Sequence, residues 1–269
     1  MNHQEKCALC GEYKELKDSH LIPQWAYRRL QQSEQGRDDP IRIADGTAVR
    51  TSKQVTKHLL CGDCEQRFSK PEDYVARLTE IDAPGKLKIL GNITRADPPH
   101  SDVAKLATEI DTKTIAYFAA SVIWRSCVMD NACKLGKYEP SFRRYLMGET
   151  DFPREASLSM LILEPSRLTA RPERLVTFPS SLKTPFAWLH GFIICGLAFR
   201  CFVGRSLNAQ MKTACLAGDG PVKYAYMMRA QEFGDFFEAC KTSTAAIPRG
   251  KLARVGGTKA MAGTRSRSV

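Results

Sequence analysis

The sequence predicts an α+β protein: a small zinc-binding unit, a larger mixed α+β domain, and a disordered basic tail. Three observations predict this order. Two C-x-x-C pairs, Cys7/Cys10 and Cys61/Cys64, bracket the first part of the chain. Apolar runs of helical and strand-like spacing follow them, without a dinucleotide fingerprint or a P-loop. The residues from 249 onward carry six cations and no acid among many small residues.

These observations divide the chain into four parts. We expect a zinc-binding domain over 1–90, a linker over 91–102 that contains a Pro-Pro pair, an α+β domain over 103–248 and the tail over 249–269. The 43% of hydrophobic residues in a chain of 269 predict a sizeable buried core. We expect the α+β domain to recognise the substrate or a protein partner.

Charge and cysteine content indicate the partners and the compartment. Forty Lys and Arg against 29 Asp and Glu give a net charge of +11, which favours a polyanion such as nucleic acid. The polar start MNHQEKCALC is unlike a signal peptide, so we expect a cytoplasmic protein. The apolar run 186–203 contains His190 and Arg200 and is interpreted as one or two buried strands, with no membrane partner. The remaining cysteines suit a reducing compartment, and four of them are expected in the core: Cys127, Cys195, Cys201 and Cys240.

In the first unit, a short strand is expected after the first cysteine pair. A helix should start at Pro23, because proline suits the first helical turn. Turn signals predict a loop or hairpin over 36–48. After the second pair, a helix over 65–81 is expected to be interrupted or restarted at Pro71, with Ser69 as its cap.

In the second unit, the run 115–128 predicts a helix buried on several sides. It contains Arg125, which must meet an acid, cap carbonyl groups or line a ligand pocket. A short helix should run from Pro140 to Gly148, and strands over 157–163, 174–178 and 192–203. Residues 224–240 are expected to form a final helix.

The two cysteine pairs predict one structural zinc ion. Four thiolates complete a tetrahedral shell, which leaves no open position for catalysis. The ion would contribute folding free energy to a unit with little core of its own. A thioredoxin-like redox role is the alternative, but neither pair lies in a βαβ pattern.

Three segments carry a family resemblance: CALCG, then DSHLIP at 18–23, then LLCGDCEQRFSK at 59–70. Over about the first 75 residues this arrangement resembles the zinc-stabilised, treble-clef branch of the HNH endonuclease superfamily, which has a ββα-metal motif. The resemblance implies a metal-dependent endonuclease that hydrolyses nucleic acid, DNA rather than RNA, as a possible effector in prokaryotic antiviral defence. It implies His20 as general base beside Mg²⁺ or Mn²⁺.

The sequence departs from the family's pattern at three polar positions. Ser19 stands where the family commonly has Asp or His, although Asp18 precedes it. The Asn expected before the second pair is absent, and Glu65 replaces the Asn or His that follows the last cysteine. A carboxylate such as Glu65 suits a hard cation. Further candidates are the carboxylates Glu72 and Asp73, and His58, which could orient His20 or contact phosphate.

Several side chains near these motifs could contact nucleic acid. Trp25 and Tyr27 could stack on bases, although helical spacing favours packing in the core. The cations that could bind phosphates are Arg28, Arg29, Arg67 and Lys70.

The missing ligands leave a second hypothesis open, namely a catalytically inactive protein that binds nucleic acid or acts as an adaptor. A third is that the α+β domain is the working part, as one component of a defence or toxin assembly.

Overall fold

A computed structural model of the chain describes residues 4–33, 36–37, 39–44, 47–83, 86–100, 102–129, 132–166, 171–229, 232 and 244–245. The expected basic tail at 249–269, and Cys240, lie outside the described residues. Within them the fold is mixed α+β, as predicted, and no helix is long and apolar enough to cross a membrane.

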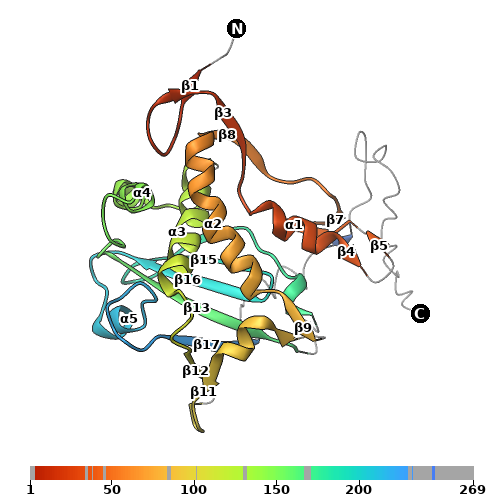
Figure 1. Cartoon of the computed structure of the whole chain (residues 1–269), viewed down its shortest axis with the longest axis vertical. Helices are drawn as coiled ribbons and strands as arrows, with labels where there is room; N and C mark the ends of the chain where they lie inside the picture. Colours follow the sequence, from red (N-terminus) through yellow and green to blue (C-terminus); the bar gives the residue numbers. More distant parts are fainter. Residues whose placement is uncertain are drawn as a thin grey trace, which may run out of the picture.

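A seven-stranded sheet forms the body of the molecule (Figure 1). In spatial order its strands are β11 (Ile93–Arg95), β12 (Val103–Leu106), β17 (Tyr224–Arg229), β13 (Ala156–Glu164), β16 (Leu197–Val203), β15 (Trp188–Ile194) and β14 (Ser180–Lys183). Neighbouring strands are antiparallel except β13 and β17, which are parallel. The central strands β13, β15 and β16 are buried on both faces for much of their length, as their apolar sequences predict.

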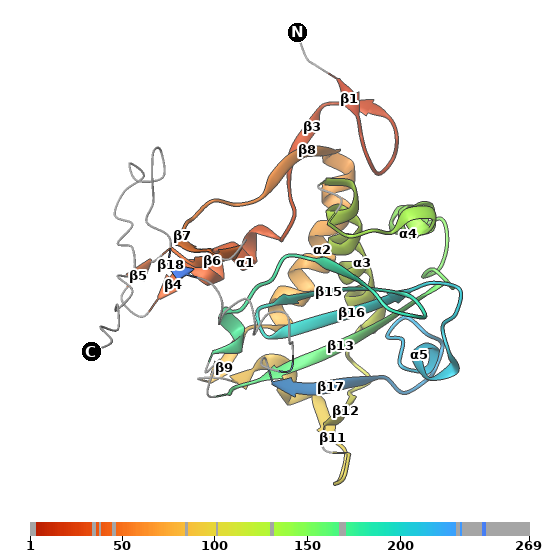
Figure 2. The same ribbon diagram turned by 180° about the vertical axis from the view of Figure 1, so that it is seen from behind.

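Helix α3 (Thr112–Met129) covers one face of this sheet, and α2 (Gly62–Leu78) packs beside it (Figures 1 and 2). The ring of Phe118 on α3 meets Phe192 and Phe199 of the sheet at 6.3 and 5.9 Å between centroids. Residues 115–126 of α3 are buried nearly all round, which confirms the prediction of a helix buried on several sides. Two shorter helices follow, α4 (Glu139–Met147) and α5 (Ala209–Thr213).

The N-terminal unit contains a ribbon of two antiparallel strands followed by a helix. Strand β3 (Leu16–His20) pairs with β8 (Thr56–Cys61), and α2 begins directly after β8. Helix α1 (Gln24–Gln31) starts after Pro23, and a hairpin of β6 (Ile41–Ala44) and β7 (Thr47–Arg50) lies in the expected place. Its other short strands are β1 (Glu5–Lys6), β2 (Tyr13–Lys14), β4 (Gln32–Ser33) and β5 (Gly36–Arg37). Beyond it lie β9 (Ile81–Ala83), β10 (Lys86–Leu87) and β18 (Thr244–Ala245).

Two chain reversals use glycine in a backbone conformation with positive φ. Helix α4 ends at Gly148, whose φ of 77° gives the left-handed cap that the sequence predicted. The β15–β16 hairpin turns at Cys195 and Gly196, both with positive φ. Gly196 has a φ of 90°, which residues with a side chain rarely adopt, and a Cβ there would push aside a methyl carbon of Leu87 at 2.6 Å, so glycine is favoured. The run 186–203 therefore forms two buried strands.

Other expectations were wrong in detail. Helix α2 continues through Pro71, because its buried face of Phe68, Val75 and Leu78 packs along its whole length. Ser69 is no cap, since its hydroxyl donates to the carbonyl of Gln66 at 2.9 Å.

Strand pairing corrects three further expectations. Residues 224–229 of the expected final helix form β17, which pairs with two strands, and the segment beyond 232 lies outside the described residues apart from 244–245. The expected strand 174–178 is a single bridge at Val176. Residues 93–95 of the expected linker form the edge strand β11.

One hydrophobic core joins the N-terminal unit to the sheet. It runs from the buried Cys7 and Leu9 through Phe68 and Phe118 to Phe199. A smaller cluster lies apart from it and consists of Leu161, Leu163, Ile193 and Ala198. Of the cysteines expected in the core, Cys195 and Cys201 are buried and Cys127 is half-buried.

A buried histidine in this sheet predicts a pH dependence of stability. His190 on β15 is fully buried, and its Nδ1 lies 2.7 Å from the Ser181 hydroxyl. Burial lowers the pKa of His190 from 6.5 to about 4, so its neutral form stabilises the fold fully above its unfolded pKa and loses that contribution as pH falls through about 4. We expect this group to remove about 3 kcal/mol between about pH 7 and pH 4. Denaturant unfolding of the wild type and His190→Gln should show a steeper pH dependence in the wild type; equal slopes would contradict it.

Candidate functional site

The four predicted cysteines form one cluster at the end of the β3–β8 ribbon where Leu16 pairs with Cys61. The sulfur atoms of Cys7, Cys10, Cys61 and Cys64 all lie within 4.8 Å of one another. The Cys10 and Cys61 sulfurs are 4.0 Å apart, and a tetrahedron of bonds of about 2.3 Å has edges of about 3.8 Å. The geometry therefore fits a metal ion such as zinc. It is the one cluster of three or more such ligands within the described part of the chain.

Backbone groups prepare this cluster for a cation. Burial raises the pKa of the Cys7 thiol, but backbone N–H groups, that of Cys61 first, outweigh it and lower the pKa to about 7. The Cys61 N–H lies 3.4 Å from the Cys7 sulfur. The pKa of Cys64 is raised, by burial and then by the neighbouring thiols. Without a metal these groups oppose one another's ionisation, and a bound cation would remove that opposition.

At the other end of β3, Ser19 faces the start of α2. Ser19 is buried, and its hydroxyl donates to the carboxylate of Glu65 in the first turn of that helix. Strand pairing fixes this contact, because β3 is registered on β8 and α2 starts where β8 ends. The helix N-terminus also favours a negative charge at Glu65. A hydroxyl and a carboxylate, both hard oxygen donors, thus lie together where the sequence departed from the family's pattern.

The other predicted residues lie around this pair. His20 follows Ser19 at the end of β3, half-buried, with its ring 6.3 Å from that of Tyr27. Asp18 and His58 are exposed and are paired across the β3–β8 ribbon. Side chains alternate along a strand, so Asp18 and His20 share the face opposite Ser19. The structure therefore brings Ser19 to Glu65, and strand alternation places Asp18 and His20 on the other face of the ribbon, with His58 paired to Asp18.

Arg125 of α3 reaches this region from the body of the molecule. Its Nη1 donates to the His20 carbonyl at 2.9 Å and its Nη2 to the Glu72 carboxylate at 2.7 Å, with the guanidinium over the Phe68 ring. The Arg125 side chain is 2% exposed. Burial raises the pKa of Glu72, and the charge of Arg125 opposes that rise. The sequence predicted that Arg125 would meet an acid or a carbonyl; its link to His20 had no signal in the sequence.

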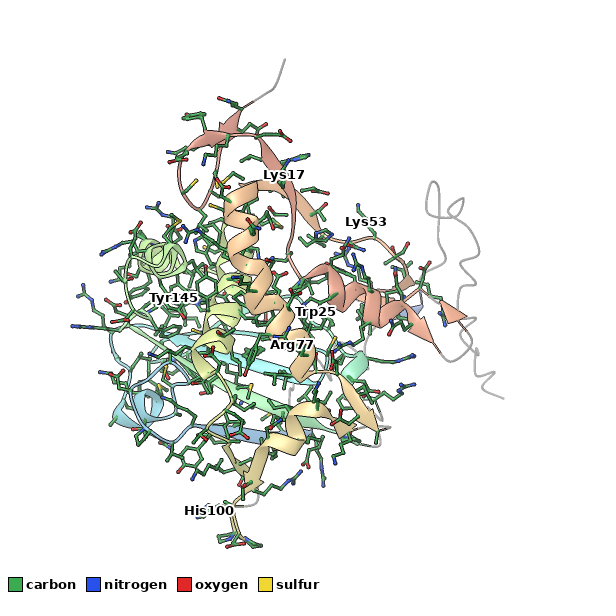
Figure 3. All side chains as sticks on the ribbon, in the orientation of Figure 1. Lys17, Trp25, Lys53, Arg77, His100 and Tyr145 are labelled. Carbon is green, nitrogen blue, oxygen red and sulfur yellow. The ribbon has the colours of Figure 1, made fainter. Side chains whose placement is uncertain are left out.

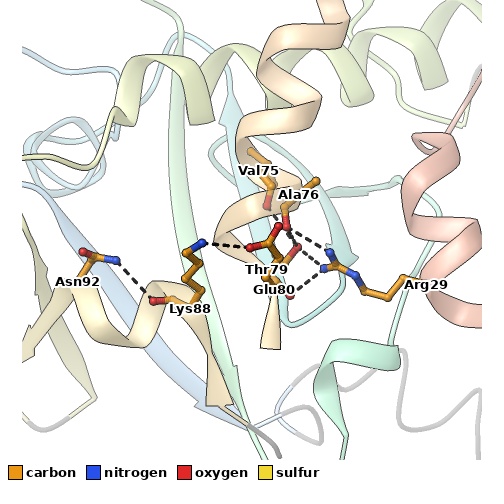
Figure 4. Close-up of polar contacts among 7 residues, drawn as sticks. All are labelled: Arg29, Val75, Ala76, Thr79, Glu80, Lys88 and Asn92. Atoms are coloured by element: carbon orange, nitrogen blue, oxygen red, sulfur yellow. Dashed lines mark hydrogen bonds and ion pairs between the residues drawn. The ribbon is translucent and has the colours of Figure 1, made fainter. Parts of the chain in front are cut away.

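The four cations expected to bind phosphates do not gather on one surface. The guanidinium of Arg29 lies over the Trp25 ring and donates to the carbonyls of Thr79 and Ala76 at 2.7 and 3.2 Å, at the end of α2 (Figure 4). Arg28 bonds to Gln24 on α1, and Arg67 donates to the Met147 carbonyl of α4 at 3.3 Å.

Lys70 is exposed on α2, as is Asp73. Tyr27 is buried, with its hydroxyl accepting from the Val55 N–H at 3.2 Å, so it packs as a core residue. Figure 3 shows Trp25 beside the α2 segment that carries Arg77.

Comparison of the chain with protein-family models, with curated proteins and with solved structures found no match.

Proposed function

We propose that the protein is a metal-dependent, HNH-like endonuclease that hydrolyses phosphodiester bonds in nucleic acid, DNA in preference to RNA. The observation that carries the proposal is the ribbon β3–β8 followed by α2, with His20 ending the first strand and Glu65 opening the helix. The four-cysteine cluster, as a zinc site in a treble clef, braces the point where β8 leads into α2, next to Glu65. The net charge of +11 supports a polyanionic substrate.

In this proposal each side chain has a separate role. His20 accepts the proton of a water molecule, whose oxygen attacks phosphorus while the bond from phosphorus to the leaving oxygen breaks. Some of Asp18, Ser19 and Glu65 would supply oxygen ligands for Mg²⁺ or Mn²⁺, and of these Asp18 shares the strand face of His20. When bound, such an ion stabilises the charge on the phosphoryl oxygens. Arg125 fixes the backbone of His20 through its carbonyl.

Cleavage assays test the proposal. Supercoiled plasmid, single-stranded DNA and RNA are incubated with Mg²⁺ or Mn²⁺ and the full chain. We expect the wild type to cut DNA and His20→Ala to cut at least about 100-fold more slowly, since a general base contributes that much or more. Glu65→Gln should also cut more slowly, because it loses a carboxylate ligand for the cation. His100→Ala, at the exposed tip far from Lys17 and β3 in Figure 3, is the matched control and should keep wild-type activity.

Two outcomes would contradict the proposal. Equal cleavage by the wild type and His20→Ala would remove His20 from the chemistry. Salt-dependent binding of DNA without cleavage, unchanged in His20→Ala, would establish instead a nucleic-acid-binding or adaptor protein. The hydrogen bond between Ser19 and Glu65 favours that second function to the extent that it keeps Glu65 from a cation.

A further inference from the structure

A cavity of about 910 Å³ lies beside the N-terminal unit, away from the cysteine cluster. Its walls come from α1, from the chain around the β6–β7 hairpin, from the segment around 174–178 and from strands β14, β15 and β16. In Figure 2 the hairpin and α1 lie beside one end of the sheet. The volume falls within the range of about 300–1,000 Å³ that is usual for small-molecule sites.

The floor of this cavity is apolar. It includes Val176, Phe178, Leu189 and Ile193. Ile193 belongs to the smaller apolar cluster of the sheet, whereas Val176 and Phe178 pack against the main core. Phe178 is half-buried, which leaves part of its ring open to a flat ligand.

The rim is strongly cationic. Five cations line the cavity against the two acids Asp39 and Glu232; the cations are Arg42, Arg50, Lys53, Arg174 and Arg200. The guanidinium of Arg42 lies 5.5 Å from the centre of the Phe178 ring, and Arg174 donates to the Gln32 carbonyl. A guanidinium has five N–H donors, so Arg42 and Arg174 keep donors for an anion while these contacts hold them in place.

Arg200 carries charge onto the apolar face itself. Burial lowers the pKa of its guanidinium, and the charge of Glu232 acts in the opposite direction. An anion bound in the cavity would stabilise that half-buried cation further. The cations thus surround one apolar floor, whereas a strand of nucleic acid would need them along a continuous groove.

We propose that this cavity binds a small anionic ligand with a flat apolar ring, the chemistry of a nucleotide. The ring packs against Phe178 and its apolar neighbours, and the phosphates meet Arg42 and Arg174. The cavity borders the candidate site through Tyr27, which lines it and lies next to His20. The proposal does not depend on nuclease activity, because its test measures binding alone.

Calorimetric titration of the full chain tests it with ATP, GTP, CTP, UTP and AMP, and with adenosine and inorganic triphosphate as half-ligands. We expect at least one nucleoside triphosphate to bind at least tenfold more tightly than adenosine or triphosphate. Arg42→Glu and Arg174→Ala should each weaken that binding at least tenfold. Arg42→Glu should weaken the binding of the nucleoside triphosphate by a larger factor than the binding of AMP. A general loss of structure would weaken both equally.

The matched control is Lys105→Ala, an exposed cation on β12 outside the cavity, which should bind as the wild type does. Thermal unfolding of each variant checks that the fold is kept. The proposal is overturned if no nucleotide binds at millimolar concentration, or if both cavity variants bind nucleotide as tightly as the wild type does. Binding of a short oligonucleotide, but of no mononucleotide, that these variants abolish would assign the cavity to nucleic-acid strands and overturn it equally.

Discussion

Cys64→Ser is expected to remove the bound metal and to lower the melting temperature by about 10 °C or more, because a structural zinc ion contributes several kcal/mol of folding free energy. Cys7, Cys61 and Cys64 are buried, so the metal-free sulfurs would remain crowded in the core. Metal analysis of the purified protein should give one zinc per chain in the wild type and less than half of that in the variant.

The matched control for this experiment is Cys127→Ser. Cys127 is half-buried and lies outside the cluster, so its replacement should leave the zinc content unchanged. A chelator should lower the melting temperature of the wild type and of Cys127→Ser but not that of Cys64→Ser. Full zinc content in Cys64→Ser would contradict a four-thiolate site.

Arg125→Leu is expected to lower the free energy of unfolding by about 3–5 kcal/mol, since it leaves Glu72 without its cation in a buried setting. The loss should be smaller near about pH 4. Burial raises the pKa of Glu72 in the folded state, so the contribution of this carboxyl to the free energy of unfolding is most favourable below its unfolded pKa and weakens as pH rises. At low pH the carboxyl is protonated and does not need the charge of Arg125. Denaturant unfolding at both pH values measures this.

Two further variants isolate the cause. Glu72→Gln in the Arg125→Leu background should recover part of the loss at neutral pH, because it removes the uncompensated charge. Arg144→Leu breaks the exposed pair with Glu149, whose atoms are 3.7 Å apart, and should cost at most about 1 kcal/mol. If Arg125→Leu costs no more than Arg144→Leu, the buried pair does not stabilise the fold.

The sequence predicted correctly those elements whose structure depends mainly on neighbouring residues in the chain. The spacing of Cys7 to Cys64 predicted the cluster, and Pro140 and Gly148 predicted the limits of α4. The apolar runs predicted β13 and one or two buried strands where β15 and β16 lie. Strand β17 was mistaken for a helix because its state is decided by β12 and β13 on its two sides. Pro71 was expected to break a helix that packing keeps continuous.

The candidate site shows the same division. The order of the motifs predicted a strand, a second strand and a helix that carry Ser19, His20 and Glu65, and strand register then brings Ser19 to Glu65. The bond between Arg125 and the His20 carbonyl joins residues 105 positions apart, and no spacing rule reveals such a contact. The cavity likewise depends on segments that meet only in the folded chain.

The core that runs unbroken from Cys7 to Phe199 has a consequence for how this protein can be handled. A cut within 91–102 would strip β11 from the sheet and expose the sides of α2 and α3 that now face each other. The end of the molecule that carries the four-cysteine cluster is therefore no transferable module. Fusion to another partner should be made at the chain ends, with the sheet retained.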